Sequence, residues 1–142
     1  MSYTQRFSEE FQLLGHIHPA SNTGETNTGY VSIANFHRTV VKFHAGVLGG
    51  DCSITLSQAT DTGGAGGKTL NAGGKDVVVH NADDNSITLI EVRTEEFDVD
   101  GGFDCMNVQV LNPVASIYDV EVWGFIPRHA PVSTAALNAV VD

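Results

Sequence analysis

The sequence predicts an all-β fold, namely an antiparallel β-sandwich or jelly-roll-like barrel of about seven or eight strands, with a short N-terminal helix or arm and an extended C-terminal tail. Segments rich in Val, Ile, Thr and aromatic residues fill the middle of the chain, and most of them alternate apolar with polar residues. Clusters of Gly, Asn, Asp and Pro separate these segments. The connections are too short for the helical crossovers that parallel strands require, so we expect antiparallel pairing.

The length of 142 residues is that of a single domain. Pattern changes along the chain divide it into three parts. We expect an N-terminal arm and loop over residues 1–29, a β-sandwich over residues 30–126 and a C-terminal tail over residues 127–142.

The N-terminal arm carries three apolar residues at helical spacing. Phe7, Phe11 and Leu14 follow one another at intervals of four and three residues, which places them on one face of a helix. This spacing predicts a short amphipathic helix or an apolar arm. Residues 18–29 show no periodicity, and we expect them to form a loop.

The expected strands also predict the core, because successive side chains of a strand point to opposite faces of the sheet. The expected strands are Tyr30–Ala34, Thr39–Ala45, Asp51–Gln58, Asp76–His80, Ser86–Arg93, Asp104–Leu111 and Ile117–Ile126. The predicted core residues are Val41, Phe43, Ile54, Leu56, Val108, Val110, Val120 and Val122.

The last expected strand has two contrasting faces. One face holds Tyr118, Val120, Val122 and Ile126, and the other holds Asp119, Glu121, Trp123 and Phe125. Acidic residues beside a Trp and a Phe indicate an outer face that is partly covered, with a neighbouring molecule as one candidate cover. After this strand, Pro127 and Pro131 end the extended structure, and Ser133 is placed to cap a brief helix through Val141.

The charge of the chain excludes several classes of partner. Seventeen Asp and Glu residues against seven Lys and Arg residues give a formal net charge of −10. We therefore expect neither nucleic acid, whose phosphates are met by clustered Lys and Arg, nor an anionic membrane surface as a partner. No apolar run approaches the roughly 20 residues of a membrane-spanning helix. The N-terminus also lacks the basic-then-apolar arrangement of a signal peptide, so we expect synthesis in the cytoplasm.

The two cysteines are expected to be free thiols. Alternation places Cys52 on the buried face of its strand, whereas the apolar residues after Cys105 are Met106, Val108 and Val110, so that Cys105 faces the other way. Opposite orientations do not favour the Cβ–Cβ approach of about 3.8 Å that a disulfide needs. Reduced thiols also fit a cytoplasmic protein.

The glycine-rich segment 59–74 contains a partial phosphate-loop motif. Residues 64–69 (GAGGKT) end like that motif, but Thr62 stands where it requires Gly. Further glycines follow, so no helix is expected to begin there and face a phosphate. The segment is therefore predicted to be a long hairpin loop and not a nucleotide site.

Candidate metal ligands occur in two incomplete sets. Asp98, Asp100 and Asp104 are candidates for a cation site, because paired carboxylates before Gly occur in calcium loops, but the further oxygen ligands and the distal Glu of such loops are missing. A two-glycine turn explains the same residues. His16 and His18 would share one face of a strand, but no third ligand follows at a matching spacing.

No pattern in the sequence identifies a catalytic residue. A Gly-x-Ser-x-Gly motif is absent, and Cys52 lies within an apolar strand, where a thiol is normally inert. A pair of carboxylates that catalyses glycoside hydrolysis is an alternative that the sequence leaves open, because the fold could bring any two acidic residues together. The single Trp and three Tyr provide few stacking surfaces for a sugar. We expect a protein that is not an enzyme and needs no cofactor.

Four segments resemble a group of small proteins encoded by tailed bacteriophages and prophages. They are Tyr30–Val41 (YVSIANFHRTVV), Ser53–Leu70 (SITLSQATDTGGAGGKTL), Glu96–Val110 (EFDVDGGFDCMNVQV) and Gly124–Ser133 (GFIPRHAPVS). The shared pattern is a strand of the form apolar-x-Leu-x-Gln-Ala-Thr-Asp, a glycine-rich loop with Lys, the run Asp-Val-Asp-Gly-Gly-Phe and a closing Pro-Arg. It spans about residues 30–133 and contains no active-site residue.

The resemblance implies a virion structural protein, and more specifically a capsid decoration (cement) protein. Such a protein binds the outside of the capsid and stabilises it by bridging neighbouring major capsid subunits. The implied partners are the major capsid protein and further copies of this chain, with a trimer as the first expectation. The implied location is the exterior of the capsid, after synthesis in the host bacterial cytoplasm. The alternatives are another virion component, such as a head–tail joining or tail protein, and a sugar- or cell-surface-binding sandwich that uses the glycine-rich loop.

The expected interface lies on elements that the sandwich does not need, namely the arm and the tail. Apolar residues on a segment too short to form a stable helix alone indicate burial against something else. The expected interface residues are Phe7, Phe11 and Leu14 of the arm, Arg128 of the tail, and Trp123 and Phe125 on the outer face of the last expected strand. Removal of residues 1–15 would then leave a folded domain that binds particles weakly, whereas an arm that fills the core of its own domain would make the same deletion unfold the protein.

Overall fold

The computed structural model describes residues 6–70 and 75–141, which form an eight-stranded antiparallel sheet with one short α-helix. The predicted all-β antiparallel fold is confirmed. The elements are α1 (Phe7–Glu10), β1 (Gln12–Asn27), β2 (Val31–Ser32), β3 (Phe36–Ala45), β4 (Cys52–Ala59), β5 (Lys68–Thr69), β6 (Val77–Val79), β7 (Ile87–Arg93), a short 3-10 helix (Thr94–Glu96) and β8 (Cys105–Pro127).

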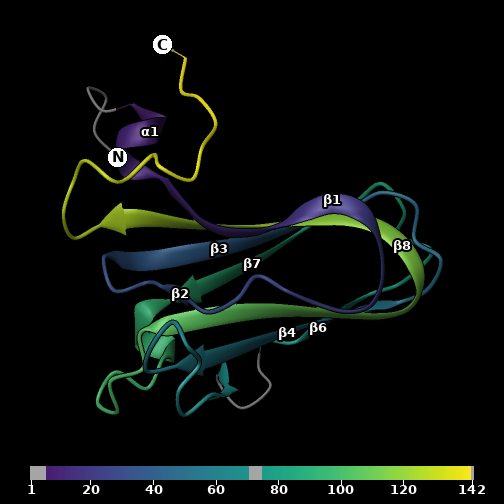
Figure 1. Cartoon of the computed structure of the whole chain (residues 1–142), viewed down its shortest axis with the longest axis horizontal. Coiled ribbons are helices and arrows are strands. Elements are labelled where there is room, and N and C mark those ends of the chain that lie inside the picture. The colour runs from purple at the N-terminus through teal and green to yellow at the C-terminus, as the bar shows by residue number, and fades with distance from the viewer. Residues whose placement is uncertain (1–5, 71–74, 142) are drawn as a thin grey trace.

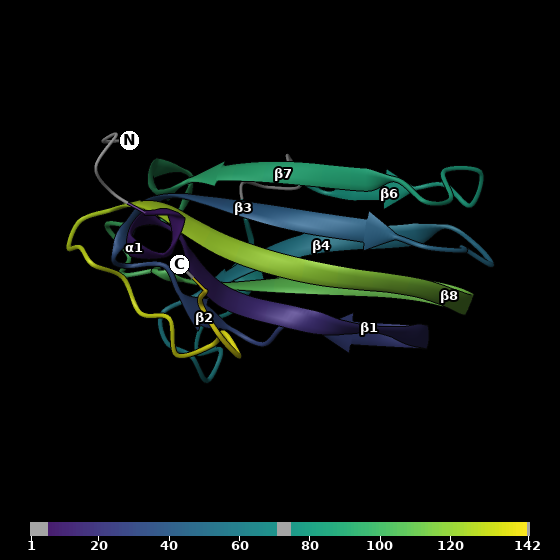
Figure 2. The same ribbon diagram turned by 90° about the horizontal axis from the view of Figure 1, so that it is seen from above.

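The long strands β1 and β8 run through both layers of the fold (Figure 1). The first part of β8 pairs with β4 and its second part pairs with β3, so the sheet order is β5-β4-β8-β3-β7. Strand β1 follows β8 from the pair Gln12–Gly124 to the pair Asn27–Gln109. Figure 2 shows β1 and β7 on opposite sides of the upper layer. The sheet therefore curls over at the bend of β8, and the two expected strands Asp104–Leu111 and Ile117–Ile126 are parts of one strand.

Buried polar side chains hold the bend of β8. Asn112 is fully buried, and its Nδ2 donates to the backbone oxygens of Asn22 and Val114. The Tyr118 hydroxyl donates to Asn112 Oδ1 over 3.0 Å. Ser116 Oγ donates to the same carbonyl of Val114, also over 3.0 Å. Because buried polar groups are stable only when they are paired, these bonds fix the path of the chain at the bend.

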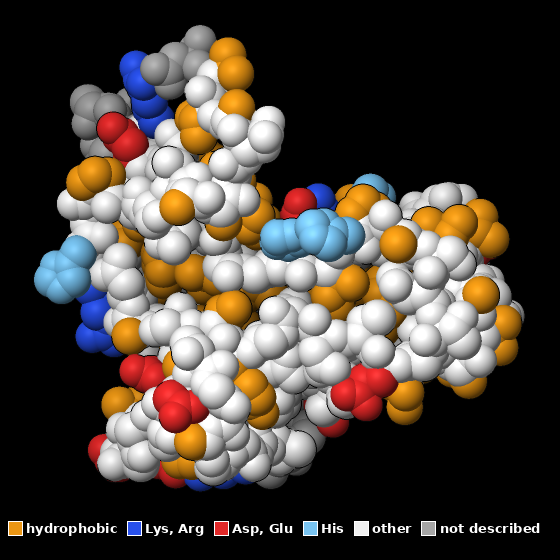
Figure 3. Space-filling model, in the orientation of Figure 1, with side chains coloured by type: hydrophobic (Ala, Val, Ile, Leu, Met, Phe, Trp, Pro, Cys, Tyr) orange, Lys and Arg blue, Asp and Glu red, His pale blue; other side chains and the backbone are white. Residues whose placement is uncertain are grey.

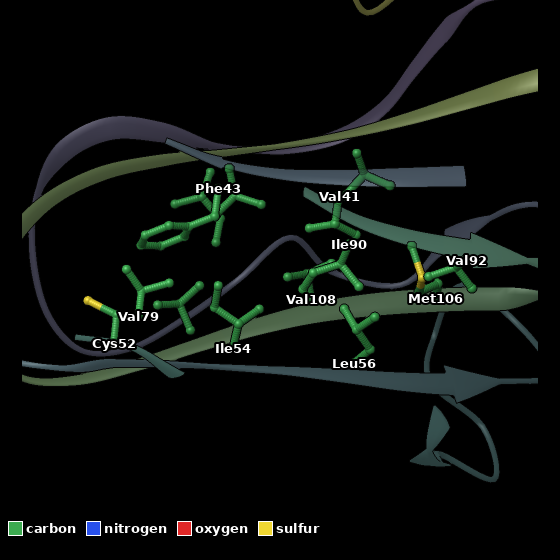
Figure 4. Close-up of a cluster of buried hydrophobic side chains, with 14 of the residues drawn as sticks. Val41, Phe43, Cys52, Ile54, Leu56, Val79, Ile90, Val92, Met106 and Val108 are labelled. Carbon is green, nitrogen blue, oxygen red and sulfur yellow. The ribbon is translucent and has the colours of Figure 1, made fainter. Parts of the chain in front are cut away.

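The core lies between the two layers, where apolar side chains from both layers point toward one another (Figure 4). All eight predicted core residues are confirmed, since each is at most 1% exposed: Val41, Phe43, Ile54, Leu56, Val108, Val110, Val120 and Val122. Alternation was sufficient to find them because each strand has one face on the core and one face on solvent.

The prediction of a loop over residues 18–29 is wrong, because most of this segment belongs to β1. Its backbone pairs with β8 as far as Asn27, with register shifts between Leu13 and Gly15, Ile17 and Ala20, and Asn22 and Gly24. Most of the β1 side chains are polar and at least partly exposed, so no apolar alternation marks the strand. Backbone hydrogen bonds to a distant strand therefore hold a segment that has no local strand signal.

The assignment of Ile126 to the buried face is wrong as well. Ile126 has a φ of 54° and is 50% exposed. The inward position before it is taken by Gly124, where a Cβ atom would come within 2.6 Å of the Phe36 ring. The buried Phe36 therefore requires a glycine at this position, and the strand turns away from regular β geometry at Ile126.

The expected helix from Ser133 to Val141 is also not formed. Residues 128–141 contain turns and bends but no helix. Ser133 Oγ accepts a hydrogen bond from the backbone N–H of Ala135, which is a local turn and not a helix cap. Among the described residues, no helix has the length and apolar character needed to cross a membrane.

Candidate functional site

An aromatic cluster joins α1 to the end of β8. The rings of Phe7 and Phe11 are stacked with their centroids 4.3 Å apart. Phe7 meets Trp123 edge-on at 5.6 Å, and Phe11 is stacked on Phe125 at 5.8 Å. The structure thus brings four of the six expected interface residues together, and we call Phe7, Phe11, Trp123 and Phe125 the arm cluster.

The pairing of β1 with β8 explains where the arm cluster forms. Leu13 lies opposite Trp123, so the residues just before β1 lie beside the C-terminal end of β8. The backbone N–H of Phe11 donates to Phe7 O over 2.9 Å, which closes the single turn of α1 and stacks the two rings. A turn this short is not stable alone, so contacts with β8 hold it.

The remaining two expected interface residues lie elsewhere. Leu14 belongs to β1 and packs against the core, so it does not share a helical face with Phe7 and Phe11. The helical spacing broke down because the helix ends at Glu10. Arg128 has an exposed side chain directly after β8, and its backbone N–H donates to Asn35 O over 2.6 Å.

The arm and the tail together form an apolar groove at one end of the molecule. The backbone N–H of Val132 donates to Glu9 O over 3.2 Å, and the Val132 side chain is buried. Between the arm and the last residues of the tail lies a groove of about 510 Å³. It is lined by Arg6, Phe7, Ser8, Leu137, Ala139, Val140 and Val141. Figure 3 shows hydrophobic side chains (orange) around α1 and the tail. Phe7 is 61% exposed, so the arm cluster presents aromatic surface to solvent.

A second apolar surface lies at the bend of β8, and sequence reasoning missed it. Val47, Leu111, Val114 and Ile117 are each between 48% and 60% exposed, and we call them the bend surface. The apolar residues around Pro113 can be read from the sequence. Only the bend of β8 in the structure shows that they lie at one end of the molecule. Orange side chains are visible at this right-hand end in Figure 3.

The candidate cation ligands do not assemble into a metal site. Asp98 Oδ2 lies 2.6 Å from Lys68 Nζ, and Asp98 Oδ1 accepts the backbone N–H of Gly101. Both hydrogen bonds lower the pKa of Asp98, and the bond from Lys68 has the larger effect. Gly102 has a φ of 79°, as expected of a glycine turn. Neither Asp100 nor Asp104 completes a ligand set: residues 6–70 and 75–141 contain no group of three or more His, Cys, Asp or Glu side chains that could hold a metal ion.

The histidine pair and the partial phosphate-loop motif are the other two features that the sequence analysis considered. The rings of His16 and His18 lie edge to face with their centroids 4.4 Å apart. Lys68 and Thr69 form β5 and pair with β4, so these motif residues do not begin a helix. Residues 71–74 of the glycine-rich segment lie outside the described residues.

Both cysteines are free thiols, as predicted, and both are buried, although alternation places only Cys52 on the buried face of its strand. Cys52 belongs to the central core, whereas Cys105 lies outside that cluster. Burial is the main cause that raises the pKa of Cys52, and burial together with Asp104 raises the pKa of Cys105 to about 11. Thiols with such pKa values stay protonated at neutral pH and are poor nucleophiles.

Comparisons with known proteins found structural similarity at low TM-scores and low sequence identity. No family model matches the chain, and no curated protein matches it. Solved structures with a similar fold include a protein of the Bacillus endospore appendages, which are disulfide-linked pili (TM-score 0.46, 12% identity, 88% of this chain and 96% of that chain covered). They also include PirA, with a TM-score of 0.42, 17% identity, and 86% of this chain and 97% of that chain covered. A third is the coat protein of Tobacco streak virus, with a TM-score of 0.40, 11% identity, and 97% of this chain and 100% of that chain covered. At these TM-scores and identities the similarity carries no argument about function.

Proposed function

We propose that this chain is a virion structural protein of a tailed bacteriophage, which binds the outside of the capsid and bridges neighbouring major capsid subunits. The observation that carries the proposal is the arm cluster. Its aromatic rings gather outside the core, and Phe7 is 61% exposed although it is a large apolar side chain. The resemblance of four sequence segments to small phage proteins supports the same function.

The arm cluster has the chemistry of a docking surface. Aromatic side chains provide much contact area and lose little conformational freedom on binding, so they contribute strongly to interfaces. Complete burial of an exposed Phe stabilises a contact by about 1.5–3 kcal/mol. Because many copies bind one shell, weak single contacts add up to a large stabilisation of the particle.

Bridging requires two separate contact surfaces on one molecule. The arm cluster and the bend surface lie at opposite ends of the molecule (Figure 1). In the proposed arrangement one end contacts one capsid subunit and the other end contacts a neighbouring subunit or another copy of this chain. A trimer around a local symmetry axis of the shell, the first expectation from the resemblance, is one closed arrangement of this kind.

Charge supports a location on the exterior of the shell. A domain with a net charge of −10 is repelled by packaged DNA. The exposed Arg128 follows β8 at the end that carries the arm cluster. An arginine there suits a capsid surface that is acidic or rich in amides, because guanidinium groups bind carboxylate and carbonyl oxygens.

The test is co-sedimentation of the purified chain with capsids assembled from the major capsid protein of the same genome. We expect the wild-type chain to bind and Phe7→Ala to bind about tenfold more weakly, which corresponds to about 1.4 kcal/mol. Leu89→Ala is the matched control, since Leu89 is 60% exposed but lies on β7. Equal binding by Phe7→Ala would contradict the role of the arm. No binding by the wild-type chain would contradict decoration, and rings formed without capsids would favour a head–tail joining or tail protein.

A further inference from the structure

A polar cleft of about 490 Å³ lies on the solvent side of the layer that contains β4. The strands β1, β8, β4 and β5 lie side by side here, and each contributes outward-facing polar side chains. The residues that matter for the argument are Glu25 and Asn27 from β1, Asn107 and Gln109 from β8, Thr55 from β4 and Thr69 from β5. The arm cluster belongs to the other layer, so the two sites are separate.

The orientation of the amides in the cleft follows from Glu25. Its carboxylate only accepts hydrogen bonds, so the Nδ2 of Asn27 must donate to Glu25 Oε1, at 2.9 Å. The Oδ1 of Asn27 then accepts from the Nδ2 of Asn107, at 3.0 Å. The Oδ1 of Asn107 is left without a donor, although Asn107 is only 8% exposed. A buried acceptor without a partner is costly, and because this oxygen has essentially no accessible surface, a donor from a bound molecule reaches it only after the Asn107 side chain turns toward the cleft.

Other polar groups in the cleft are available to a ligand as well. No hydrogen bond to the hydroxyl groups of Thr55 and Thr69 occurs within residues 6–70 and 75–141. Hydrogen bonds from Asn27 and Gln109 lower the pKa of Glu25, so the carboxylate is ionised at neutral pH and accepts hydrogen bonds. The cleft therefore offers hydroxyl, amide and carboxylate groups, and Tyr30 is the aromatic residue in its lining.

Gly67, Lys68 and Thr69 of the glycine-rich segment line one side of the cleft, and the Tyr30 ring packs against this part of the segment. The Tyr30 hydroxyl donates to Ser57 Oγ over 3.2 Å. A Cβ atom at Gly64 would come within 2.9 Å of the Tyr30 ring, and one at Gly67 within 2.8 Å of its hydroxyl oxygen. Only glycine at these positions lets the loop approach the ring so closely.

The one lysine beside the cleft is already engaged. Lys68 Nζ lies 2.6 Å from Asp98 Oδ2 and 4.1 Å from the centroid of the Phe103 ring. Its charge is therefore matched within the chain. This leaves Glu25 as the charge that a ligand meets, which disfavours sulfated, phosphorylated or carboxylated molecules.

We propose that this cleft binds a neutral carbohydrate. Sugar hydroxyl groups both donate and accept hydrogen bonds, so they can pair with the threonine hydroxyls and the Glu25 carboxylate together, and with Asn107 Oδ1 once its side chain turns toward the cleft. An apolar ligand would leave these groups unpaired, and an anion would be repelled by Glu25. Binding rests on hydrogen bonds and not on ring stacking, in keeping with the few Trp and Tyr residues of the chain. The site is independent of the proposed capsid contacts.

The first test is an array of neutral and anionic oligosaccharides, probed with the full-length chain. We expect at least one neutral oligosaccharide to bind, and its affinity for the chain is then measured by titration. The double variant Thr55→Val/Thr69→Val removes two hydroxyl groups while keeping side-chain volume, and we expect it to bind at least about tenfold more weakly. The control Ser21→Ala/Thr23→Val removes hydroxyl groups from exposed positions of β1 outside the cleft and should bind normally.

Three results would overturn the proposal: no neutral oligosaccharide bound, binding of anionic oligosaccharides only, or equal affinity of the Thr55/Thr69 variant. Thermal melting of both variants shows that each is folded. Co-sedimentation of the Thr55/Thr69 variant with capsids should match that of the wild-type chain. A failure of the carbohydrate proposal is thereby distinguished from a failure of the capsid proposal.

Discussion

At the scale of single residues, the position of a side chain along a strand decides whether it is buried. Leu56 and its neighbours on β4 illustrate this, because Leu56 is fully buried while Thr55 and Ser57 face the polar cleft. At Gly124 the neighbouring residue decides the size of the side chain. The Phe36 ring fills the space that a Cβ atom at this position would need. Such close packing makes the core sensitive to the loss of a few methyl groups.

We predict that Leu56→Ala lowers the free energy of unfolding by about 2–5 kcal/mol, because it removes buried methyl groups and leaves a cavity. Denaturant unfolding measures this change. Leu89→Ala is the control, since the Leu89 side chain is 60% exposed, and it should change the stability by less than about 0.5 kcal/mol. A similarly small loss for Leu56→Ala would mean that Leu56 does not face the core.

At the scale of elements, the arm and β1 have different roles although they are continuous in the chain. Strand β1 is paired with β8 along most of its length and carries the core residue Ile17. Helix α1 precedes the sheet and contacts it through the arm cluster. The sheet begins at Gln12, earlier in the chain than expected from the sequence. A deletion of residues 1–15 would therefore remove the first residues of β1 as well as the arm.

We predict that a chain lacking residues 1–11 folds and binds capsids more weakly than the full chain. A chain lacking residues 1–15 should melt at a lower temperature than the shorter deletion, because it also loses Leu14, which packs against the core. For a domain of this size, each kcal/mol of lost stability lowers the melting temperature by about 2–4 °C. Circular dichroism melting and co-sedimentation distinguish the two effects. Unfolding of the chain that lacks residues 1–11 would show that the arm completes the core.

At the scale of the whole molecule, one long strand joins two layers into a single hydrophobic core. β8 pairs with β4 on one side of its bend and with β3 on the other, so neither layer is complete without it. The bend also separates the bend surface from the arm cluster. This separation gives the molecule two apolar ends, which the proposed bridging function requires.

We predict that the fold depends on no metal ion. Asp98 is paired with Lys68, and no cluster of metal-ligating side chains occurs within the described ranges 6–70 and 75–141. Treatment with EDTA should therefore leave the melting temperature unchanged. A decrease of several degrees that is reversed by added calcium would contradict this prediction, since a bound ion stabilises the folded state.

The sequence was sufficient to predict the antiparallel β class, the core positions from Val41 to Val122 and the free cysteines. Alternation encodes these features locally, because each strand has one buried face. The sequence singles out Phe7 and Phe11 by their helical spacing, and Trp123 and Phe125 by their place beside acidic residues on the outer face of the last expected strand. Strand β1 could not be predicted, because its polar side chains carry no alternation and backbone hydrogen bonds to β8 hold it. The curl of the sheet, the exposed Ile126, the bend surface and the polar cleft likewise depend on contacts between residues far apart in the chain, and local periodicity contains no record of such contacts.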